Sequence, residues 1–243
     1  MEYPHNRPYT ADDLVRIITL LRDPVNGCPW DKVQTHTSIR MNFLEEAYEA
    51  VDALDLDDPV LMCEELGDVL MQVAFHTCME QETGRFTWEQ VCDGVCQKLI
   101  ERHPNIFGTQ PGYEGITDWD ALKNKEKGRR TLADDLESVP RAMPALMRAA
   151  KLQKRAARHG AALQGADAAA LADAAENLQA AQPASAQAEQ AVGELLFAAA
   201  NLARQAGVDP EQALQKANEA FCTAAGPVAV SYTHLTLPTK LEV

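Results

Sequence analysis

The sequence is short of basic residues and contains no long apolar run. Its 243 residues include 22 Lys and Arg against 36 Asp and Glu, so the formal net charge is −14. Proteins that bind nucleic acid usually carry a basic stripe, so we expect no nucleic-acid partner. The absence of a run of about 18 apolar residues predicts no membrane-spanning helix. The N-terminal sequence lacks the basic and then apolar order of a signal peptide, so we expect a cytoplasmic protein without a membrane partner.

Cysteines are few and do not follow a metal-binding pattern. The six cysteines are scattered at positions 28, 63, 78, 92, 96 and 222, several of them within apolar helical stretches. Scattered thiols of this kind behave as small hydrophobic residues in a reducing compartment. Cys92 and Cys96 share a helix face, but no second ligand pair accompanies them, which disfavours a metal site there.

Two consecutive acidic helices carry the strongest functional signal. Pro59 disfavours helix in the residue before it and suits the first turn of a new helix, so the stretch divides there. On the first helix Glu49 follows Glu46 by three positions, and on the second helix Asp68 follows Glu65 by three. Residues three apart share a helix face, so each helix presents a pair of carboxylates.

An antiparallel pairing of these two helices brings the four carboxylates to one point, with Glu45 beside them. Four carboxylates in a partly dry site repel one another, so some must protonate or a cation must lie among them. A site made only of anionic oxygens suits Mg²⁺, or Mn²⁺, better than zinc. The alternative is two acidic helix faces in water, and the apolar residues beside both pairs disfavour it. These neighbours, which we expect to pack, are Leu44, Tyr48, Val51, Leu54, Met62, Leu66, Val69, Leu70 and Val73.

A loop and a later helix supply groups that suit a nucleotide. The loop over residues 23–38 contains Trp30, which either contacts a base or ribose or plugs the end of the helical bundle. The helix that begins after Thr87 carries Lys98 and Arg102 four positions apart on one face. These two cations either grip phosphate oxygens or form ordinary surface ion pairs.

The motif E-E-x-x-E, followed after a short gap by E-x-x-D, resembles the MazG family of nucleoside triphosphate pyrophosphohydrolases. Flanking stretches agree: C-P-W-D-K-V-Q-T-H-T-S at 28–38, E-L-G-D-V-L-M-Q-V-A-F-H at 65–76 and R-H-P-N-I-F-G at 102–108. The resemblance covers residues 8 to about 225. It implies an all-α fold and hydrolysis of nucleoside triphosphates to a monophosphate and pyrophosphate.

With the resemblance, each candidate residue receives a role. We expect Glu45 to orient the attacking water or to support a ligand from behind. The family also uses a Trp and a Lys to hold the nucleotide, and stacking on an indole implies broad base selectivity. The expected Mg²⁺ ligands are Glu46, Glu49, Glu65 and Asp68. The expected substrate-binding residues are Lys98, Arg102, Trp119, Lys123 and Trp30.

Two other functions stay open for the same fold. One is a non-catalytic nucleotide-sensing or regulatory protein. The other is a narrow-specificity pyrophosphohydrolase that acts on dUTP or on a phosphoribosyl nucleotide. A pyrophosphate-release assay with mixed triphosphates separates the enzyme from the sensor, and a comparison of canonical with deaminated triphosphates addresses the narrow specificity.

The second half of the sequence repeats the helical pattern of the first. E-L-G-D-V-L-M-Q-V-A-F at 65–75 corresponds to A-V-G-E-L-L-F-A-A-A-N at 191–201, and Gly84 and Gly207 each follow a helix. The pattern predicts tandem MazG-like helical bundles, which long members of the family contain. The second copy is degenerate, because alanine replaces four of the functional residues. Ala174, Ala191, Ala220 and Ala224 stand at the places of Glu46, Glu65, Lys98 and Arg102.

These patterns predict how the chain is divided. We expect a catalytic domain over residues 1–135, a degenerate second domain over 136–230, and a homodimer of the whole chain. Residues 131–140 read as a linker, and the Ala-rich residues 161–190 supply little core volume. Residues 231–243 turn abruptly to Thr-rich sequence without a place in either copy, so we interpret them as an artefactual or disordered tail.

Overall fold

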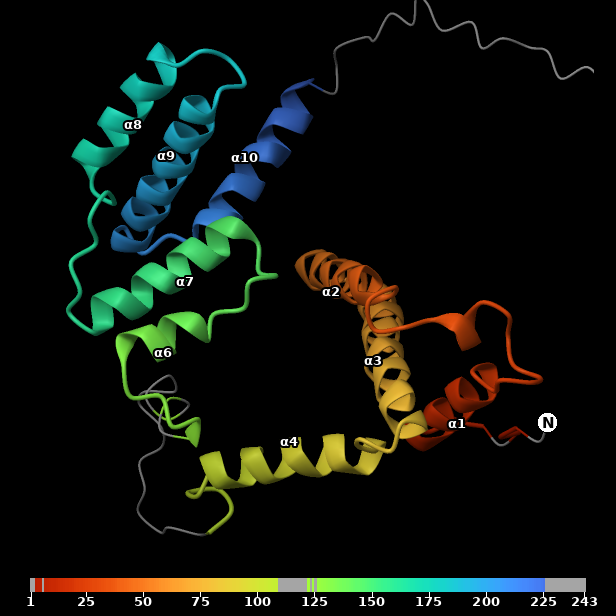
Figure 1. Cartoon of the computed structure of the whole chain (residues 1–243). Coiled ribbons are helices and arrows are strands. Elements are labelled where there is room, and N and C mark those ends of the chain that lie inside the picture. The colour runs from red at the N-terminus through yellow and green to blue at the C-terminus, as the bar shows by residue number, and fades with distance from the viewer. Residues whose placement is uncertain (1–2, 6, 109–121, 123, 125, 226–243) are drawn as a thin grey trace, which may run out of the picture. The chain divides into compact units, whose positions relative to one another are not determined.

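Helices form all the regular structure in the part of the chain that is described (Figure 1). The structure is a computed structural model that describes residues 3–5, 7–108, 122, 124 and 126–225. The predicted all-α fold is confirmed. None of the described helices combines the length and the apolarity that crossing a lipid bilayer requires. The chain divides into two compact units, Met1–Thr117 and Asp118–Val243.

The first unit is built around one long helix. Its elements are α1 (Ala11–Leu21), the 3-10 helix η1 (Asp31–Val33), α2 (Arg40–Asp55), α3 (Pro59–Glu82) and α4 (Trp88–Arg102). Helix α3 packs against α1, α2 and α4. Only three residues, 56–58, connect α2 to α3, so the two helices form an antiparallel hairpin.

Local capping signals place the helix ends of this unit where the sequence predicts them. The Thr10 hydroxyl accepts a hydrogen bond from the Asp13 N–H at 3.3 Å, and Thr87 caps α4 with Gln90 in the same way. Asp58 caps α3, and Pro59 occupies its first turn. Gly84 follows α3 with a φ of +70°, a left-handed conformation that glycine adopts without steric cost.

The apolar core of the first unit lies at the C-terminal half of α3. The cluster joins α1, α3 and the start of α4 through Val15, Ile18, Ile39, Ala74, Phe75, Cys78, Met79 and Trp88. The N-terminal half of α3, which carries Glu65 and Asp68, contributes no residue to this cluster. The core therefore anchors one end of the hairpin and leaves the acidic end free to form a site.

Five apolar neighbours of the acidic residues, which we expected to pack, are exposed in the single chain. They are between 40% and 54% exposed: Tyr48, Val51, Leu54, Leu66 and Leu70. The reason is geometric. Helix α1 covers only one side of the α2–α3 hairpin, and the described part of the unit offers no helix for the other side.

The second unit repeats the packing order of the first. Its helices are α6 (Leu132–Glu137), α7 (Ala145–Arg158), α8 (Ala168–Ala180), α9 (Ala186–Gln205) and α10 (Pro210–Ala225). Helices α8 and α9 form the hairpin, and α7 and α10 pack against α9 as α1 and α4 pack against α3. Gly207 follows α9 with a φ of +73°. This shared order supports the predicted tandem repeat, which stays a prediction.

The predicted linker at 131–140 was wrong, because helix α6 occupies it. Thr131 caps this helix, and Asp135 is 1% exposed. The Asp135 carboxylate pairs with Arg155 of α7 at 2.9 Å and lies 3.2 Å from His159 Nε2. A buried carboxylate is stable only with such partners, and they lie about twenty residues away in sequence. Helix α6 therefore belongs to the packing of the second unit.

Alanine forms most of the apolar core of the second unit, as its composition predicts. Polar side chains add long-range ties between its helices. Gln153 of α7 donates a hydrogen bond to the Phe197 carbonyl of α9 at 2.7 Å, and Asn201 of α9 donates one to the Ala166 carbonyl at 2.6 Å. Cysteine makes no disulfide, since all six thiols are free. The predicted tail at 231–243 lies outside the described residues.

Candidate active site

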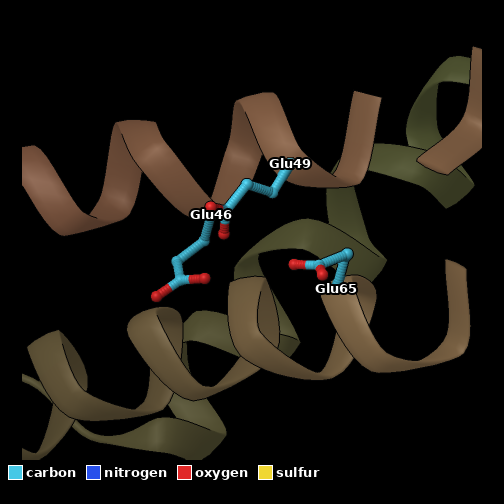
Figure 2. A group of neighbouring side chains, drawn as sticks. All are labelled: Glu46, Glu49 and Glu65. Carbon is cyan, nitrogen blue, oxygen red and sulfur yellow. The ribbon is translucent and has the colours of Figure 1, made fainter. Parts of the chain in front are cut away.

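Three of the four predicted metal ligands converge between α2 and α3 (Figure 2). One carboxylate oxygen from each of Glu46, Glu49 and Glu65 lies within 4.8 Å of the others. Figure 2 shows Glu46 and Glu49 on one helix of the hairpin, with the Glu65 carboxylate directed toward them from the other. In the described part of the chain, this is the only group of three or more acidic, His or Cys side chains so close together.

The cluster is electrostatically unfavourable when it holds no cation. Partial burial, followed by the negative charge of Asp68, raises the pKa of Glu46 above its ordinary value. Partial burial, followed by the charges of Glu49 and Asp68, raises the pKa of Glu65. All the charges that perturb these two groups are negative. A bound cation would favour the ionised carboxylates and remove this penalty.

Asp68 and Glu45 lie beside this group of three. Asp68 is half-buried and acts on the pKa of both Glu46 and Glu65. Glu45 is exposed and contributes the smallest of the charge effects on Glu46. The structure therefore brings Asp68 to the cluster and leaves Glu45 at its solvent edge.

Gln72 is a contact that the sequence reasoning missed. It is buried one turn beyond Asp68 on α3, and its side-chain amide donates a hydrogen bond of 3.4 Å to Glu46 Oε1. The Gln72 side-chain oxygen is buried without a partner among the described residues. The spacing of Glu65, Asp68 and Gln72 on one helix face was the signal that could have identified it.

Two polar clusters hold the loop that precedes α2 against α3. In the first, buried Arg22 pairs with Glu82 at 2.6 Å and donates hydrogen bonds to the carbonyls of Asp31 and Gln34 at 2.8 and 3.2 Å. A charged group bonded at several points fixes the backbone more strongly than one surface pair does. The loop that carries Trp30 is thereby attached to the same helix as Glu65.

In the second cluster, His36 joins the loop to the far end of α3. Its Nε2 lies 2.5 Å from a Glu80 oxygen, and its Nδ1 lies 2.7 Å from His76 Nδ1. Glu80 is buried and also pairs with Arg85 at 2.6 Å. Burial, followed by the charge of His36, lowers the pKa of His76. No residue spacing predicts this cluster, because His36 and His76 are forty residues apart in the sequence.

Trp30 does not plug the bundle. It is 56% exposed, and its carbonyl accepts a hydrogen bond from the Gln34 side chain at 2.9 Å. Of the two alternatives for this residue, exposure disfavours the structural one. The predicted nucleotide contacts Trp119 and Lys123 lie outside the described residues.

Lys98 and Arg102 lie on a different helix from the carboxylates. Both lie in the second half of α4, whose first residue, Trp88, packs in the core beside the C-terminal half of α3. Figure 1 shows α4 leading away from the α2–α3 hairpin. Their predicted role in phosphate binding stays a prediction.

The second unit has a cavity at the place that corresponds to the acidic cluster. This cavity of about 640 Å³ lies between α8 and α9 and is lined by Ala174, Asn177 and Glu194. When D-A-A-E-N at 173–177 is aligned with the first acidic motif, Ala174 stands at the place of Glu46 and Asn177 at the place of Glu49. The space is therefore present, and two acids, Asp173 and Glu194, line it, but alanine and asparagine stand at the places of Glu46 and Glu49.

An all-helical unit with a carboxylate cluster across a helical hairpin agrees with the class that the resemblance implied, the all-α nucleotide pyrophosphohydrolases. Residues 34–107 match the model of the MazG nucleotide pyrophosphohydrolase domain, and this match lies wholly in the first unit.

The relatives extend the comparison over most of the chain. The chain is 41% identical over 219 residues to a nucleoside triphosphate pyrophosphohydrolase of Escherichia coli (strain K12), covering 86% of this chain and 83% of the relative. It is 39% identical over 212 residues to the nucleoside triphosphate pyrophosphohydrolase/pyrophosphatase MazG of Thermotoga maritima, covering 86% and 82%. The chain therefore belongs to the MazG nucleotide pyrophosphohydrolase family.

Proposed function

We propose that the chain hydrolyses nucleoside triphosphates to the monophosphate and pyrophosphate, with divalent metal and broad base selectivity. The observation that carries the proposal is the approach of Glu46, Glu49 and Glu65 to within 4.8 Å in a member of this family. The pyrophosphohydrolase activity is the one that the names of the E. coli and T. maritima relatives state. Broad selectivity rests on the exposed indole of Trp30, which suits any base.

The donor set fits Mg²⁺. It offers only carboxylate oxygens, which hard cations prefer, and partial burial and neighbouring negative charges raise the pKa of both Glu46 and Glu65. When bound, Mg²⁺ polarises phosphate oxygens and lowers the pKa of the attacking water. The side chains of Glu46, Glu49, Glu65 and Asp68 would hold the ion.

Other groups of the chain position this site and the substrate. Gln72 orients Glu46 through its hydrogen bond, and Glu45 orients the water or supports a ligand from the solvent edge. Lys98 and Arg102 neutralise the outer phosphates. Because α4 leads away from the hairpin, the proposed homodimer would bring these two cations to a bound triphosphate.

An exposed apolar face supports the homodimer. Tyr48, Val51 and Leu54 of α2 lie on the same helix face at spacings of three, and Leu66 and Leu70 of α3 are exposed as well. Monomeric proteins rarely expose apolar patches of this kind, since covering them is favourable. A second copy of the chain on this face would bury these residues beside the carboxylates. Size measurement in solution tests this part of the proposal.

The function is tested by pyrophosphate release from canonical and deaminated triphosphates, with Mg²⁺ and with EDTA. We expect release from several bases, only with metal, and its loss in Glu65→Gln but not in the matched control Glu64→Gln. Glu64 is an exposed acid on the same helix, so both variants lose one negative charge. Binding without release would favour the nucleotide sensor. Release from dUTP or a phosphoribosyl nucleotide alone would favour the narrow-specificity enzyme.

A further inference from the structure

A second cavity of the second unit is basic in a chain that is otherwise acidic. It has a volume of about 680 Å³ and lies among α7, α9 and the start of α10. Its cationic lining residues are Lys151, Lys154, Arg155, Arg158 and Arg204. One acid, Asp209, also lines it, and one of its oxygens accepts hydrogen bonds from the N–H groups of Glu211 and Gln212. In a protein of net charge −14, this cavity concentrates positive charge.

Three of these cations form no ion pair with a described residue. Among the described residues, Lys151 and Lys154 form neither an ion pair nor a hydrogen bond, and Arg204 forms no ion pair. Arg155 differs, because its guanidinium is paired with buried Asp135 and serves the packing of α6. Cations that converge without acidic partners repel one another, so an anion among them would be stabilised.

The helices also fix the positions of these cations. Lys151 and Lys154 are three positions apart, so they share one face of α7. Across the cavity, Arg204 Nε donates a hydrogen bond of 2.9 Å to the Asn201 side chain. Asn201 is itself buried and bonded to the Ala166 carbonyl. This chain of bonds holds the Arg204 guanidinium in place before any ligand binds, which lowers the entropic cost of binding.

The positive charge of α7 has no counterpart in α1, the helix at the corresponding position of the first unit. Helix α7 contains five Lys and Arg and no acid, whereas the corresponding helix α1 contains one Arg and two Asp. A basic face is therefore not a requirement of this packing position. The second unit has alanine at the places of Glu46 and Glu65, yet its helix α7 carries more positive charge than α1 does.

The cavity is larger than phosphate needs and has an apolar side. Met147 and Val208 line it and are 38% and 48% exposed. Its volume lies within the range of about 300–1,000 Å³ that small-molecule sites occupy. We propose that this cavity binds a phosphorylated ligand of nucleotide size, with its phosphates on Lys151, Lys154 and Arg204 and its planar part against Met147 and Val208.

The proposal is tested by calorimetric titration of the full chain in EDTA. Without metal the carboxylate cluster repels phosphates, so binding at the basic cavity is measured alone. The probes are inorganic pyrophosphate and an ATP analogue with a methylene bridge between its α and β phosphorus atoms. We expect one site per chain and tighter binding of the ATP analogue. Equal affinity for both probes, or no binding of either, would overturn the proposal.

Matched variants locate the site. Lys151→Gln/Arg204→Gln should weaken binding of both probes about tenfold or more, since each charged hydrogen bond is worth at least that factor. The control Arg16→Gln/Lys216→Gln removes two positive charges outside the cavity and should bind as the unmodified protein does. Met147→Ser should weaken the ATP analogue and leave pyrophosphate unchanged.

Each alternative outcome contradicts the proposal. Equal weakening by the control pair would show a general charge effect. Unchanged binding in Lys151→Gln/Arg204→Gln, with thermal melting showing a folded protein, would place the ligand elsewhere. Binding of a short oligonucleotide, with no response to the ATP analogue, would show a polyanion surface instead of a nucleotide site.

Discussion

Replacing Glu46 by Gln should reverse the order of stability between variant and unmodified protein when Mg²⁺ is added. The substitution keeps the volume of the side chain and removes one negative charge from the cluster. In EDTA the variant should be the more stable of the two, because repulsion has been relieved. In Mg²⁺ the unmodified protein should be the more stable, because it alone retains the complete ligand set.

The distance between the carboxylate oxygens sets how much repulsion the substitution removes. Two unit charges at 4.8 Å repel by roughly 0.9 kcal/mol in water and by about 3.5 kcal/mol at an effective dielectric constant of about 20. Glu49 is exposed and Glu46 is half-buried, so solvent screening favours the lower figure. We expect the metal-free variant to gain about 1 kcal/mol, or about 2–4 °C in Tm for a chain of this size.

The stabilisation of the unmodified protein by Mg²⁺ follows from the free energy of ion binding. Mg²⁺ at a hundred times its Kd stabilises a protein by about 2.7 kcal/mol, which exceeds the expected gain of the variant. Differential scanning calorimetry in EDTA and in saturating MgCl₂ measures both terms. The control is Glu64→Gln, which loses the same charge from an exposed position on α3 and should gain stability from Mg²⁺ as the unmodified protein does.

Two results would refute this reasoning. If Glu46→Gln gains as much stability from Mg²⁺ as the unmodified protein, Glu46 is not a ligand of the ion. If the variant is clearly less stable in EDTA, the hydrogen bond from Gln72 outweighs the repulsion, and the cluster is not electrostatically strained.

Three further predictions concern other parts of the chain. Lys98→Ala and Arg102→Ala should each weaken triphosphate binding by about 1.5–3 kcal/mol. Titrations should show a smaller loss for the monophosphate, and an equal loss would argue against contact with the outer phosphates. Because the folded state lowers the pKa of His76, the unfolded chain takes up the proton first as the pH falls below about 6.5. Stability should therefore fall with acidification, and less so in His76→Gln, as thermal melts from neutral to mildly acidic pH will measure. Of the fragments 1–130 and 131–225, only the first should release pyrophosphate; metal-dependent release by the second would contradict its degenerate site.

The confirmed predictions of helix starts rested on signals between residues that are close in the sequence. A capping hydroxyl acts on the N–H three residues later, so Thr10 and Thr87 place α1 and α4 from sequence alone. Spacing on one face works in the same way, because helix geometry is fixed. Once residues 56–58 force α2 and α3 to be antiparallel, Glu46 and Glu65 have to face each other, and one oxygen of each lies within 4.8 Å of the other.

The features that could not be predicted from the sequence depend on contacts between residues that are far apart in the chain. Arg22 is sixty residues from Glu82, and one Arg among many acids does not identify its partner. The burial of Asp135 depends on Arg155, so a stretch that reads as a linker becomes a packed helix. Apolar composition likewise does not say whether Leu54 is covered by its own chain or by a partner.

The candidate sites of the two units carry opposite charge on helical hairpins that pack in the same order. In the first, carboxylates line the α2–α3 hairpin, so phosphates are repelled until a cation is present. In the second, Lys151 and Arg204 line the cavity among α7, α9 and α10, so phosphates are attracted without metal. A second copy under no functional demand would have no reason to keep uncompensated charge, since converging cations destabilise the fold that holds them. Binding of phosphates to the second unit in EDTA, lost in Lys151→Gln/Arg204→Gln, would show that these cations serve a ligand and not only the fold.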